Sequence, residues 1–349
     1  MQKRVDGNTI ILESSSGETL LTTEVQGSRA ILRHGDWSMV KDMGMDPHNL
    51  LSSVDTSNAQ RACLKFYDIT IELNSDLPGL VSDVLETYER FSREEIVEAD
   101  VIIHAFSGSF CSNYPFTMVV LADSGVRIKG DFSAVSYFRN MDDLLFQIHS
   151  DIEVLFLTNN PKYSFIHGGS VEKNGTGFML PAVSGSGKTT LVLALMQAGY
   201  TVYSDEFAVL DNLSGNLLPF QRSLSVREDS LRLFPMLKNN TSEYSKLSSP
   251  KEVLYNVPLT GDQSLSTTCP VRYIIFPEYR RDTTPTITSI SRMAAFRRLV
   301  DSQNFISLGT SEKQRSIDLM LSVISQAECY DLTTGDPTLT VSIIDSLGV

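Results

Sequence analysis

The sequence has few of the features that mark secreted, membrane-spanning or metal-cluster proteins. It has only four cysteines, Cys63, Cys111, Cys269 and Cys329, which lie far apart and show no CxxC spacing. This scarcity argues against a disulfide framework or a zinc cluster and fits a reducing compartment. No apolar run approaches the roughly 20 residues that a membrane-spanning helix needs, and the N-terminal segment lacks the apolar stretch of a signal peptide. We therefore expect a cytoplasmic protein without a membrane partner.

Positive charge is scarce as well. The chain has 29 Lys and Arg against 42 Asp and Glu, which gives a formal net charge of −13. Because a basic face supplies most of the affinity in nucleic-acid binding, this balance argues against a nucleic-acid partner and against an anionic membrane surface. A small phosphate site inside an acidic protein is still compatible with it. With 349 residues, the chain is long enough for two domains.

The first half of the chain mixes strand and helix patterns and carries no chemical motif. We expect residues 1–60 to form an N-terminal extension, with residues 41–58 as a loop rich in Gly, Pro, Asp, Ser and Asn. Residues 61–160 are expected to form an α+β domain, for which substrate recognition is one role that its position allows. The spacing of apolar residues predicts strands at 19–25, 28–34, 63–73, 101–106, 116–122 and 126–132, and helices at 80–91 and 142–157.

The second half, residues 161–349, has a clearer pattern of strands alternating with helices. Asn174-Gly175 is typical of a type I′ turn and predicts a hairpin. Gly199 suits the left-handed position that follows the end of a helix. The apolar spacing predicts strands at 163–172, 177–182, 200–206, 271–276 and 329–333, helices at 191–198, 291–300 and 313–326, and a loop-rich stretch over 207–270.

A glycine-rich stretch in the second half matches the P-loop pattern. Residues 182–189 read AVSGSGKT, with Ala in the first position, where Gly is more usual. Gly185 and Gly187 allow a tight turn in which several N–H groups point at one anion, and the helix that follows adds its positive N-terminal end. Lys188 can reach the outer phosphates of a nucleotide, and the Thr189 hydroxyl can bind Mg²⁺.

A Gly- and Ser-rich turn before an ordinary helix is the alternative interpretation of this motif. The apolar strand before it and the Ala- and Leu-rich helix after it are the context that a phosphate site requires, so we favour ATP binding by the loop. The residues expected to contact ATP are Ser184, Gly185, Ser186, Gly187, Lys188, Thr189 and Thr190.

The next predicted strand ends in two acids. Asp205 and Glu206 follow Lys188 by 17 and 18 residues with one short helix in between, so we expect their strand to lie next to the strand that enters the loop. Acids at this place hold Mg²⁺ or polarise a hydroxyl, although a turn or a helix cap is the alternative. His167, on the first strand of the hairpin, could tune the proton affinity of these acids or be an ordinary packed residue.

These features together resemble the catalytic domain of HPr kinase/phosphorylase and, more closely, the HPr-kinase-related P-loop kinases. The resemblance covers residues 160–340 and is carried by HGG at 167–169, LPAVSGSGKTTL at 180–191, GYTVYSDEFAVLD at 199–211 and LPFQRSLSVRE at 218–228. It implies an α/β fold, namely a P-loop kinase domain of the HPr kinase/PEP carboxykinase type with a mixed α+β N-terminal region.

The resemblance also implies roles for individual residues. Asp205 falls on the general base for the acceptor hydroxyl, assisted by His167, and Glu206 falls on an Mg²⁺ ligand. Arg222 and Arg227 belong to a Pro-x-x-Arg-x-x-x-x-Arg-like run, which implies contacts with phosphate or acceptor. HPr kinase has paired aspartates where this chain has Asp205-Glu206, and its Pro-Gly-Arg-Asn loop has no counterpart here. These departures argue against HPr as the acceptor and against a phosphorylase activity.

The sequence therefore predicts an ATP- and Mg²⁺-dependent phosphotransferase that acts on a hydroxyl, with Ser of a protein or peptide as the acceptor. A small-metabolite kinase or carboxykinase-like enzyme is one alternative, and a nucleotide-dependent binding protein without chemistry is another. The roles of the two acids are open: with Asp205 on Mg²⁺ and Glu206 as base, water could be the acceptor and the protein an ATPase. A homo-oligomer is also open, because HPr kinases assemble as hexamers.

Overall fold

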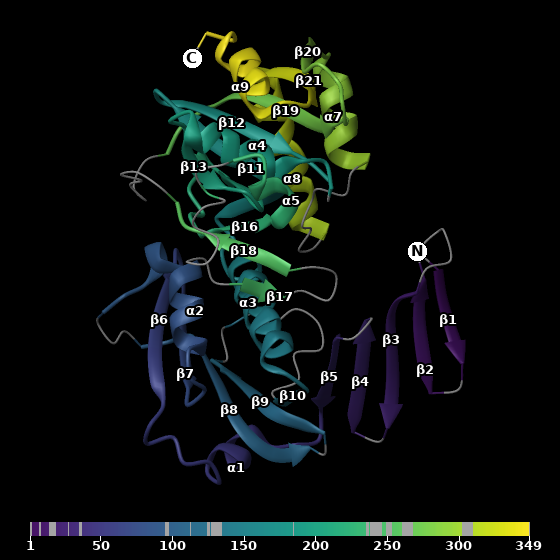
Figure 1. The fold of residues 1–349 in the computed structure, drawn as a ribbon, viewed down its shortest axis with the longest axis vertical. Coiled ribbons are helices and arrows are strands. Elements are labelled where there is room, and N and C mark those ends of the chain that lie inside the picture. The colour runs from purple at the N-terminus through teal and green to yellow at the C-terminus, as the bar shows by residue number, and fades with distance from the viewer. Residues whose placement is uncertain are drawn as a thin grey trace. The chain divides into compact units, whose positions relative to one another are not determined.

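The computed structural model shows a mixed α/β protein that divides into two units (Figure 1). The first unit comprises Met1–Asn160 and Ser245–Leu254, and the second comprises Pro161–Tyr244 and Tyr255–Val349. The division after residue 160 coincides with the expected start of the second domain. The structure describes residues 2–6, 8–13, 19–26, 28–34, 37–94, 98–111, 113–123, 126, 135–183, 185–234, 237, 246–248, 253–259, 268–301 and 310–348.

One sheet runs through most of the first unit. Its strands are, in the order in which they lie side by side, β1 (Gln2–Asp6), β2 (Thr9–Glu13), β3 (Thr19–Gln26), β4 (Arg29–His34), β5 (Trp37–Asp42), β10 (Val135–Phe138), β9 (Tyr114–Ala122), β8 (Val101–Cys111), β7 (Ile69–Ser75) and β6 (Gln60–Phe66). Because β5 pairs with β10, the sheet continues across the expected boundary at residue 60. The strands expected at 19–25, 28–34, 101–106 and 116–122 are confirmed, and the one expected at 126–132 lies almost entirely outside the described residues.

The single strand expected over residues 63–73 is wrong. The chain instead forms a hairpin of β6 and β7, which turns at Tyr67 with a positive φ of +52°. Alternating apolar residues continue through this turn, and it contains neither Gly nor Asn, the residues that would reveal it. A distant residue contributes to it, because the buried Asn160 side chain accepts a hydrogen bond from the Asp68 N–H at 2.9 Å.

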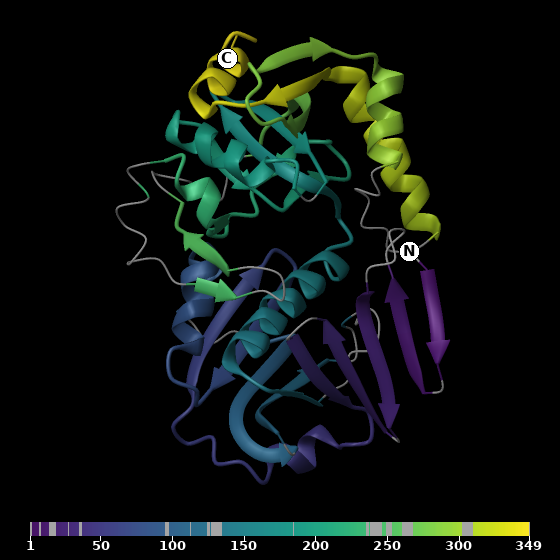
Figure 2. The same ribbon diagram turned by 45° about the vertical axis from the view of Figure 1, so that its right-hand side comes forward.

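The helices of the first unit are α1 (Pro47–Leu51), α2 (Leu80–Thr87), the 3₁₀ helix η1 (Glu89–Phe91) and α3 (Met141–Thr158). The loop expected over 41–58 is wrong in part, because the Asp46 side chain accepts hydrogen bonds from two following N–H groups and so begins α1. The helices expected at 80–91 and 142–157 are confirmed. Both α2 and α3 contact β7 and each other, so they lie on one face of the sheet (Figures 1 and 2). A short strand, β17 (Lys246–Ser248), also contacts α3.

Asp151 carries one of the two buried carboxyl groups on α3. The Asp151 side chain is 7% exposed and accepts a hydrogen bond from Gln147 Nε2 at 2.6 Å. Burial raises the pKa of Asp151 from 3.8 to about 7. The folded protein therefore binds this proton more tightly than the unfolded chain does, and the free energy of unfolding falls as the pH rises from about 4 to about 7.

We predict that Asp151→Asn stabilises the protein at about pH 8, where the buried wild-type carboxylate is charged, more than at about pH 5, where it is protonated. The expected difference is about 3 kcal/mol, because each pKa unit corresponds to about 1.4 kcal/mol. The measurement is urea unfolding at both pH values. Asp142→Asn, at an exposed position of the same helix, is the matched control. An equal effect of Asp151→Asn at both pH values would contradict the prediction.

The main sheet of the second unit has a long central hairpin. Its strands are, in order, β15 (Leu217–Leu218), β14 (Phe207–Asp211), β11 (Tyr163–Lys173), β12 (Thr176–Pro181), β19 (Val271–Tyr279), β21 (Glu328–Thr334) and β20 (Thr286–Ser289), with β13 (Thr201–Ser204) paired to β11 beside β14. The hairpin β11–β12 turns at Asn174-Gly175, where both residues have positive φ, as a type I′ turn requires. Since β12, β19 and β21 run parallel, their carboxyl ends meet at one edge.

Helices cover both faces of this sheet. They are α4 (Lys188–Gln197) and α9 (Pro337–Asp345) on one face, and α7 (Arg292–Asp301) and α8 (Thr310–Gln326) on the other. Side chains of β12 alternate between the two layers: Phe178 and Leu180 are buried in the cluster with α4, and Met179 in the cluster with α8. None of the helices in the described part of the chain is long and apolar enough to cross a membrane.

Two expectations for the second unit are wrong. The strand that leads to the acids, β13, does not lie next to β12, because β11 lies between them and pairs with both. Residues 207–270 are not mainly loop, since their described part contains β14, β15, β16 (Leu224–Arg227), α5 (Glu228–Leu231) and β18 (Val253–Val257). The strand β20 and the helix α9 have no counterpart in the expected pattern. The remaining strands and helices expected in this unit are confirmed.

Candidate functional site

The turn between β12 and α4 is built by glycines. Gly185 and Gly187 both have a φ of +84°, a left-handed conformation that glycine adopts without strain. Gly187 is the N-cap of α4, and its carbonyl accepts the Leu191 N–H at 2.9 Å. The first N–H groups of α4 therefore have no partner within the helix. Ser186 lies in this turn with a buried Oγ that has no hydrogen-bond partner among the described residues, and Ser184 lies outside them.

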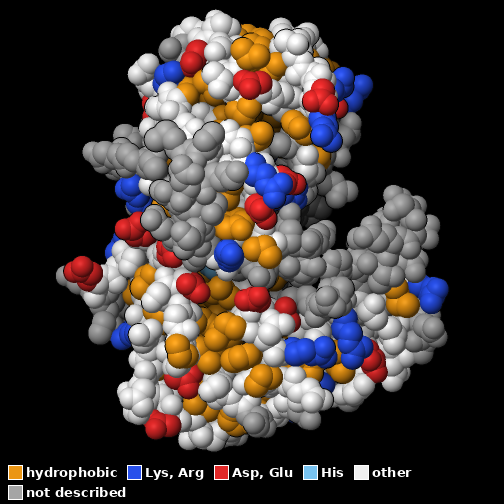
Figure 3. Space-filling model, viewed as in Figure 1, with side chains coloured by type: hydrophobic (Ala, Val, Ile, Leu, Met, Phe, Trp, Pro, Cys, Tyr) orange, Lys and Arg blue, Asp and Glu red, His pale blue; other side chains and the backbone are white. Residues whose placement is uncertain are grey.

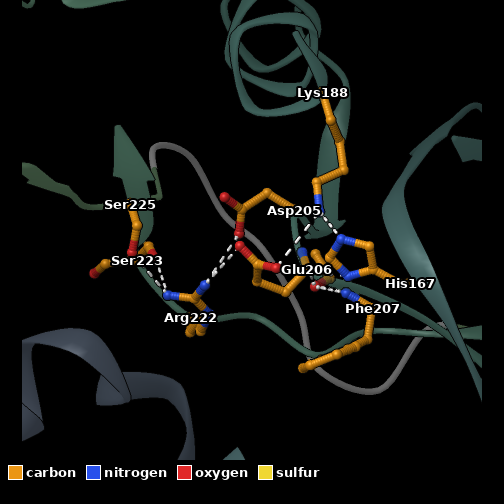
Figure 4. A network of polar contacts seen from close by, with 9 residues as sticks. His167, Lys188, Asp205, Glu206, Phe207, Arg222, Ser223 and Ser225 are labelled. Carbon is orange, nitrogen blue, oxygen red and sulfur yellow. Dashed lines mark hydrogen bonds and ion pairs between the residues drawn. The ribbon is translucent and has the colours of Figure 1, made fainter. Parts of the chain in front are cut away.

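The first residue of α4 reaches into a polar cluster. Lys188 is 8% exposed, and its Nζ lies 3.4 Å from His167 Nε2 on β11 and 3.4 Å from Glu206 Oε2 (Figure 4). Gly169, two residues after the histidine, allows this approach, because a Cβ there would lie 2.7 Å from the Val192 side chain of α4. The sequence HGG at 167–169 therefore both supplies a cluster residue and lets the helix pack closely on the strand.

The two acids occupy a tight bend between β13 and β14. Ser204 Oγ accepts hydrogen bonds from the N–H groups of Glu206 and Phe207, each at 3.0 Å. The Glu206 carbonyl accepts the Gly168 N–H at 3.0 Å, which ties the bend to β11. Glu206 therefore faces both the histidine of β11 and the lysine of α4, although its strand is not the neighbour of β12.

Arg222 joins the two acids from the opposite side of the cluster. The residue is 7% exposed, and its Nη2 lies 3.7 Å from Asp205 Oδ1 and 3.4 Å from Glu206 Oε1. Its Nη1 donates to the Ser223 carbonyl at 3.3 Å and to Ser225 Oγ at 3.0 Å (Figure 4). The guanidinium therefore contacts both carboxylates, and the contact with phosphate or acceptor that the resemblance implies stays a prediction.

Burial and neighbouring charges shift the pKa values of the cluster residues in different directions. Burial raises the pKa of Asp205, which is fully buried and whose carboxylate oxygens accept no hydrogen bond from the described residues. Burial would also raise the pKa of Glu206, but Lys188 and, next, Arg222 lower it below its ordinary value. Burial and the charge of Lys188 lower the pKa of His167, which favours the neutral imidazole. Asp205 is thus the stronger base, and Glu206 the more stable carboxylate.

His167 lies beside one of the two acids. Its Nδ1 lies 3.8 Å from Glu206 Oε2, and it forms no hydrogen bond or ion pair with Asp205 among the described residues. Its position between Lys188 and Glu206 suits a residue that sets the geometry of these two groups. The expectation that it approaches the acids is met at Glu206 only.

The other expected site residues lie around this cluster. Thr189, half-buried, follows the lysine in the first turn of α4. The Thr190 hydroxyl is 2.7 Å from Ser230 Oγ of α5, so it joins two helices. Arg227 is exposed at the opposite end of β16 from Arg222, where it is the N-cap of α5. The structure thus brings together His167, Lys188, Asp205, Glu206 and Arg222.

Two residues beside the loop have no place in the expected site. The Tyr279 N–H, at the end of β19, donates to the Ser186 carbonyl at 3.0 Å, and Thr334 ends the adjacent β21. Strands that run parallel to β12 end at the same edge of the sheet, where the loop begins. This rule indicates that the last residues of β19 and β21 lie beside the loop. No family model matches the chain, and no curated protein matches it either.

Proposed function

We propose that this chain is an ATP-dependent phosphotransferase, with residues 161–349 as a P-loop kinase domain of the HPr kinase/PEP carboxykinase type. The observation that carries the proposal is the 3.4 Å approach of Lys188 Nζ to the Glu206 carboxylate, beside the fully buried Asp205. Phosphoryl transfer at a P-loop requires a lysine at the start of a helix that follows a glycine-rich turn, together with acids from another strand. This chain has both. A protein that only binds nucleotide has no need of a buried carboxylate without a hydrogen-bond partner, so we favour an enzyme.

The proposed reaction is direct transfer of the γ-phosphoryl group of ATP to a hydroxyl. The N–H groups of the loop and the Lys188 ammonium hold the β- and γ-phosphates. Asp205, whose pKa is raised by burial, accepts the hydroxyl proton as the acceptor oxygen bonds to the γ-phosphorus. The bond from the γ-phosphorus to the β–γ bridging oxygen breaks, and ADP leaves. Arg222 keeps both carboxylates in place during these steps.

Mg²⁺ belongs to this proposal as the cofactor. Its ligands would be the Glu206 carboxylate, which the surrounding cations keep ionised, and the Thr189 hydroxyl. The described residues contain no group of three or more His, Cys, Asp and Glu that could hold a metal ion. That is compatible with Mg²⁺, which takes one or two protein carboxylates together with phosphates and waters. The ion would neutralise charge on the β- and γ-phosphate oxygens.

For the acceptor we propose a serine hydroxyl of a protein or peptide, with the first unit as the part that recognises it. On the face drawn in Figure 3, Lys and Arg side chains lie in small groups among Asp and Glu. That mixture supports an acceptor other than a nucleic acid or an anionic membrane. All four cysteines are free thiols, which supports a cytoplasmic location.

Transfer of label from γ-labelled ATP tests the proposal. The full-length protein with Mg²⁺ and a cell extract is expected to label serine in a macromolecule, and the same mixture without Mg²⁺ is the control. Label on a small molecule would favour a metabolite kinase instead, and label released as phosphate would favour an ATPase. A complete lack of ADP formation with every acceptor would contradict the enzyme assignment and leave a nucleotide-binding protein.

A further inference from the structure

The glycine-rich loop between β12 and α4 has a different strand on each of its two sides. In the sheet, β11 lies on one side of β12 and β19 on the other (Figure 1). Lys188, His167 and both acids gather on the β11 side. If the proposed function holds, and this inference rests on it, the γ-phosphate lies toward that side. The nucleoside end of the same triphosphate then lies on the flank formed by β19.

Tyr279 ends β19 directly against the loop. Its N–H donates to the Ser186 carbonyl at 3.0 Å. A Cβ added to Gly187 would lie 3.1 Å from the Tyr279 Cβ and 3.8 Å from its Cγ, so the tyrosine side chain runs beside the glycine that begins α4. The side chain is nevertheless 51% exposed. A large aromatic ring is thus fixed at the loop by its backbone while much of its surface is open.

The alternation along β19 places this ring on the same face of the sheet as α4. Tyr273 and Ile275 are buried in the cluster with α4, and the residues between and after them face the helices of the other layer. Tyr279 is separated from these two residues by an even number of positions, so its side chain lies on the same face of the sheet. Thr334, which lies opposite Tyr279 on β21, is on this face as well. Its Oγ1 would lie 3.6 Å from a Cβ added to Gly187.

The charged residues next to Tyr279 in the sequence form ion pairs with one another. The Arg280 guanidinium binds Glu278 at 3.1 Å, and Arg281 lies 3.7 Å from Asp282. Both pairs are exposed and contribute little fixed charge to the flank. What Tyr279 presents beside the loop is therefore an uncharged aromatic face, which suits a nucleobase better than a further phosphate.

We propose that Tyr279 is the base-stacking residue of a nucleoside triphosphate site, with the base on the β19 flank and the γ-phosphate at Lys188. Stacking uses the π-face that every base has, so this contact favours nucleoside triphosphates over inorganic triphosphate without selecting one base. Loss of a single base–aromatic stack is expected to weaken binding by about ten-fold or more.

Calorimetric titration of the full-length protein with Mg²⁺-ATP and with Mg²⁺-tripolyphosphate tests this inference. Tyr279→Ala is expected to weaken ATP binding about ten-fold or more and to leave tripolyphosphate binding unchanged. Tyr279→Phe, which keeps the aromatic face, should bind both ligands as the wild type does. The bond from residue 279 to Ser186 comes from the backbone and persists in both variants, and a thermal melt checks that each folds.

The outcomes separate this inference from the proposed function. Unchanged ATP affinity in Tyr279→Ala would overturn the stacking role while the phosphate site stands. An equal loss for ATP and tripolyphosphate would overturn it too, because the tyrosine would then only shape the loop. A wild-type protein that binds neither ligand would overturn the proposed function and the stacking role together.

Discussion

Replacement of Asp205 with asparagine is expected to lower the rate of phosphoryl transfer by about 10²–10⁴-fold, the usual contribution of a general base. The affinity for ATP should stay nearly unchanged, because the triphosphate is held by the loop and Lys188. The reason lies in the burial of Asp205, which raises its pKa and so strengthens it as a proton acceptor. Steady-state transfer rates and calorimetric ATP titration measure the two quantities separately.

The pH profile gives this prediction a second readout. Wild-type activity should rise with pH through the raised pKa of Asp205, because the base acts only when deprotonated, and that rise should be absent in Asp205→Asn. Asp282→Asn, which removes an exposed carboxylate of the same unit, is the matched control. Near-normal turnover of Asp205→Asn would show that another group is the base.

Glu206→Gln distinguishes the two possible assignments of the acids. The proposal takes Glu206 as the Mg²⁺ ligand, since Lys188 and Arg222 lower its pKa. The variant should therefore need a higher Mg²⁺ concentration for half-maximal activity. If Glu206→Gln instead abolished transfer and Asp205→Asn shifted the Mg²⁺ requirement, the two roles would be exchanged.

Lys188→Ala is expected to lower kcat/KM for ATP by about 10²–10³-fold, the cost of one preorganised charge-stabilising donor. Its ammonium lies 3.4 Å from the Glu206 carboxylate, and in the proposed complex it exchanges that partner for the outer phosphates. The variant also removes the first of the cations that lower the pKa of Glu206. A thermal melt is therefore needed alongside the kinetics to detect loss of folding.

A second lysine of the same unit provides the control for this variant. Lys173, on β11, forms an ion pair with Asp345 at 2.7 Å, and in the described part of the chain it forms no hydrogen bond or ion pair with the cluster around Glu206. Lys173→Ala should lower the melting temperature while leaving ATP kinetics intact. Equal effects of Lys188→Ala and Lys173→Ala on kinetics would contradict a direct role of Lys188 at the phosphates.

The local elements around the loop were predictable because their signals are local. The glycines of SGSGKTT need positive φ values, the Asn174-Gly175 dipeptide specifies its own turn, and the acids end an apolar strand. The structure confirms the hairpin, the helix α4 and the strand β13. The Lys188 ammonium lies 3.4 Å from the Glu206 carboxylate, although the strand that leads to the acids is not the neighbour of β12.

The order of the strands was not predictable in the same way. Sequence spacing shows that α4 connects β12 to β13, but it does not show that β11 pairs with both and so lies between them. The hairpin at Tyr67 was missed because its turn depends on the distant Asn160 rather than on Gly or Asn. The pattern does not indicate strand β14, because its apolar run directly after the acids is only five residues long.

The contacts of Arg222 with the two acids could not be predicted from its motif. Its place in an Arg-containing run implies a contact with phosphate or acceptor, which stays a prediction, and the structure adds that the buried side chain bridges the two acids. Tyr279 shows the opposite case, since no motif marks it and only the parallel pairing of β19 with β12 brings it to the loop. The positions of both side chains depend on contacts between segments far apart in the sequence.

A crystal structure of the full-length protein with Mg²⁺ and a non-hydrolysable ATP analogue would show directly whether the loop binds the triphosphate. We expect the β- and γ-phosphates to lie against the N–H groups of residues 185–189, with Lys188 Nζ moved from Glu206 to the phosphates. A nucleotide bound elsewhere, or an unbroken contact between Lys188 and Glu206 in the loaded protein, would contradict this expectation.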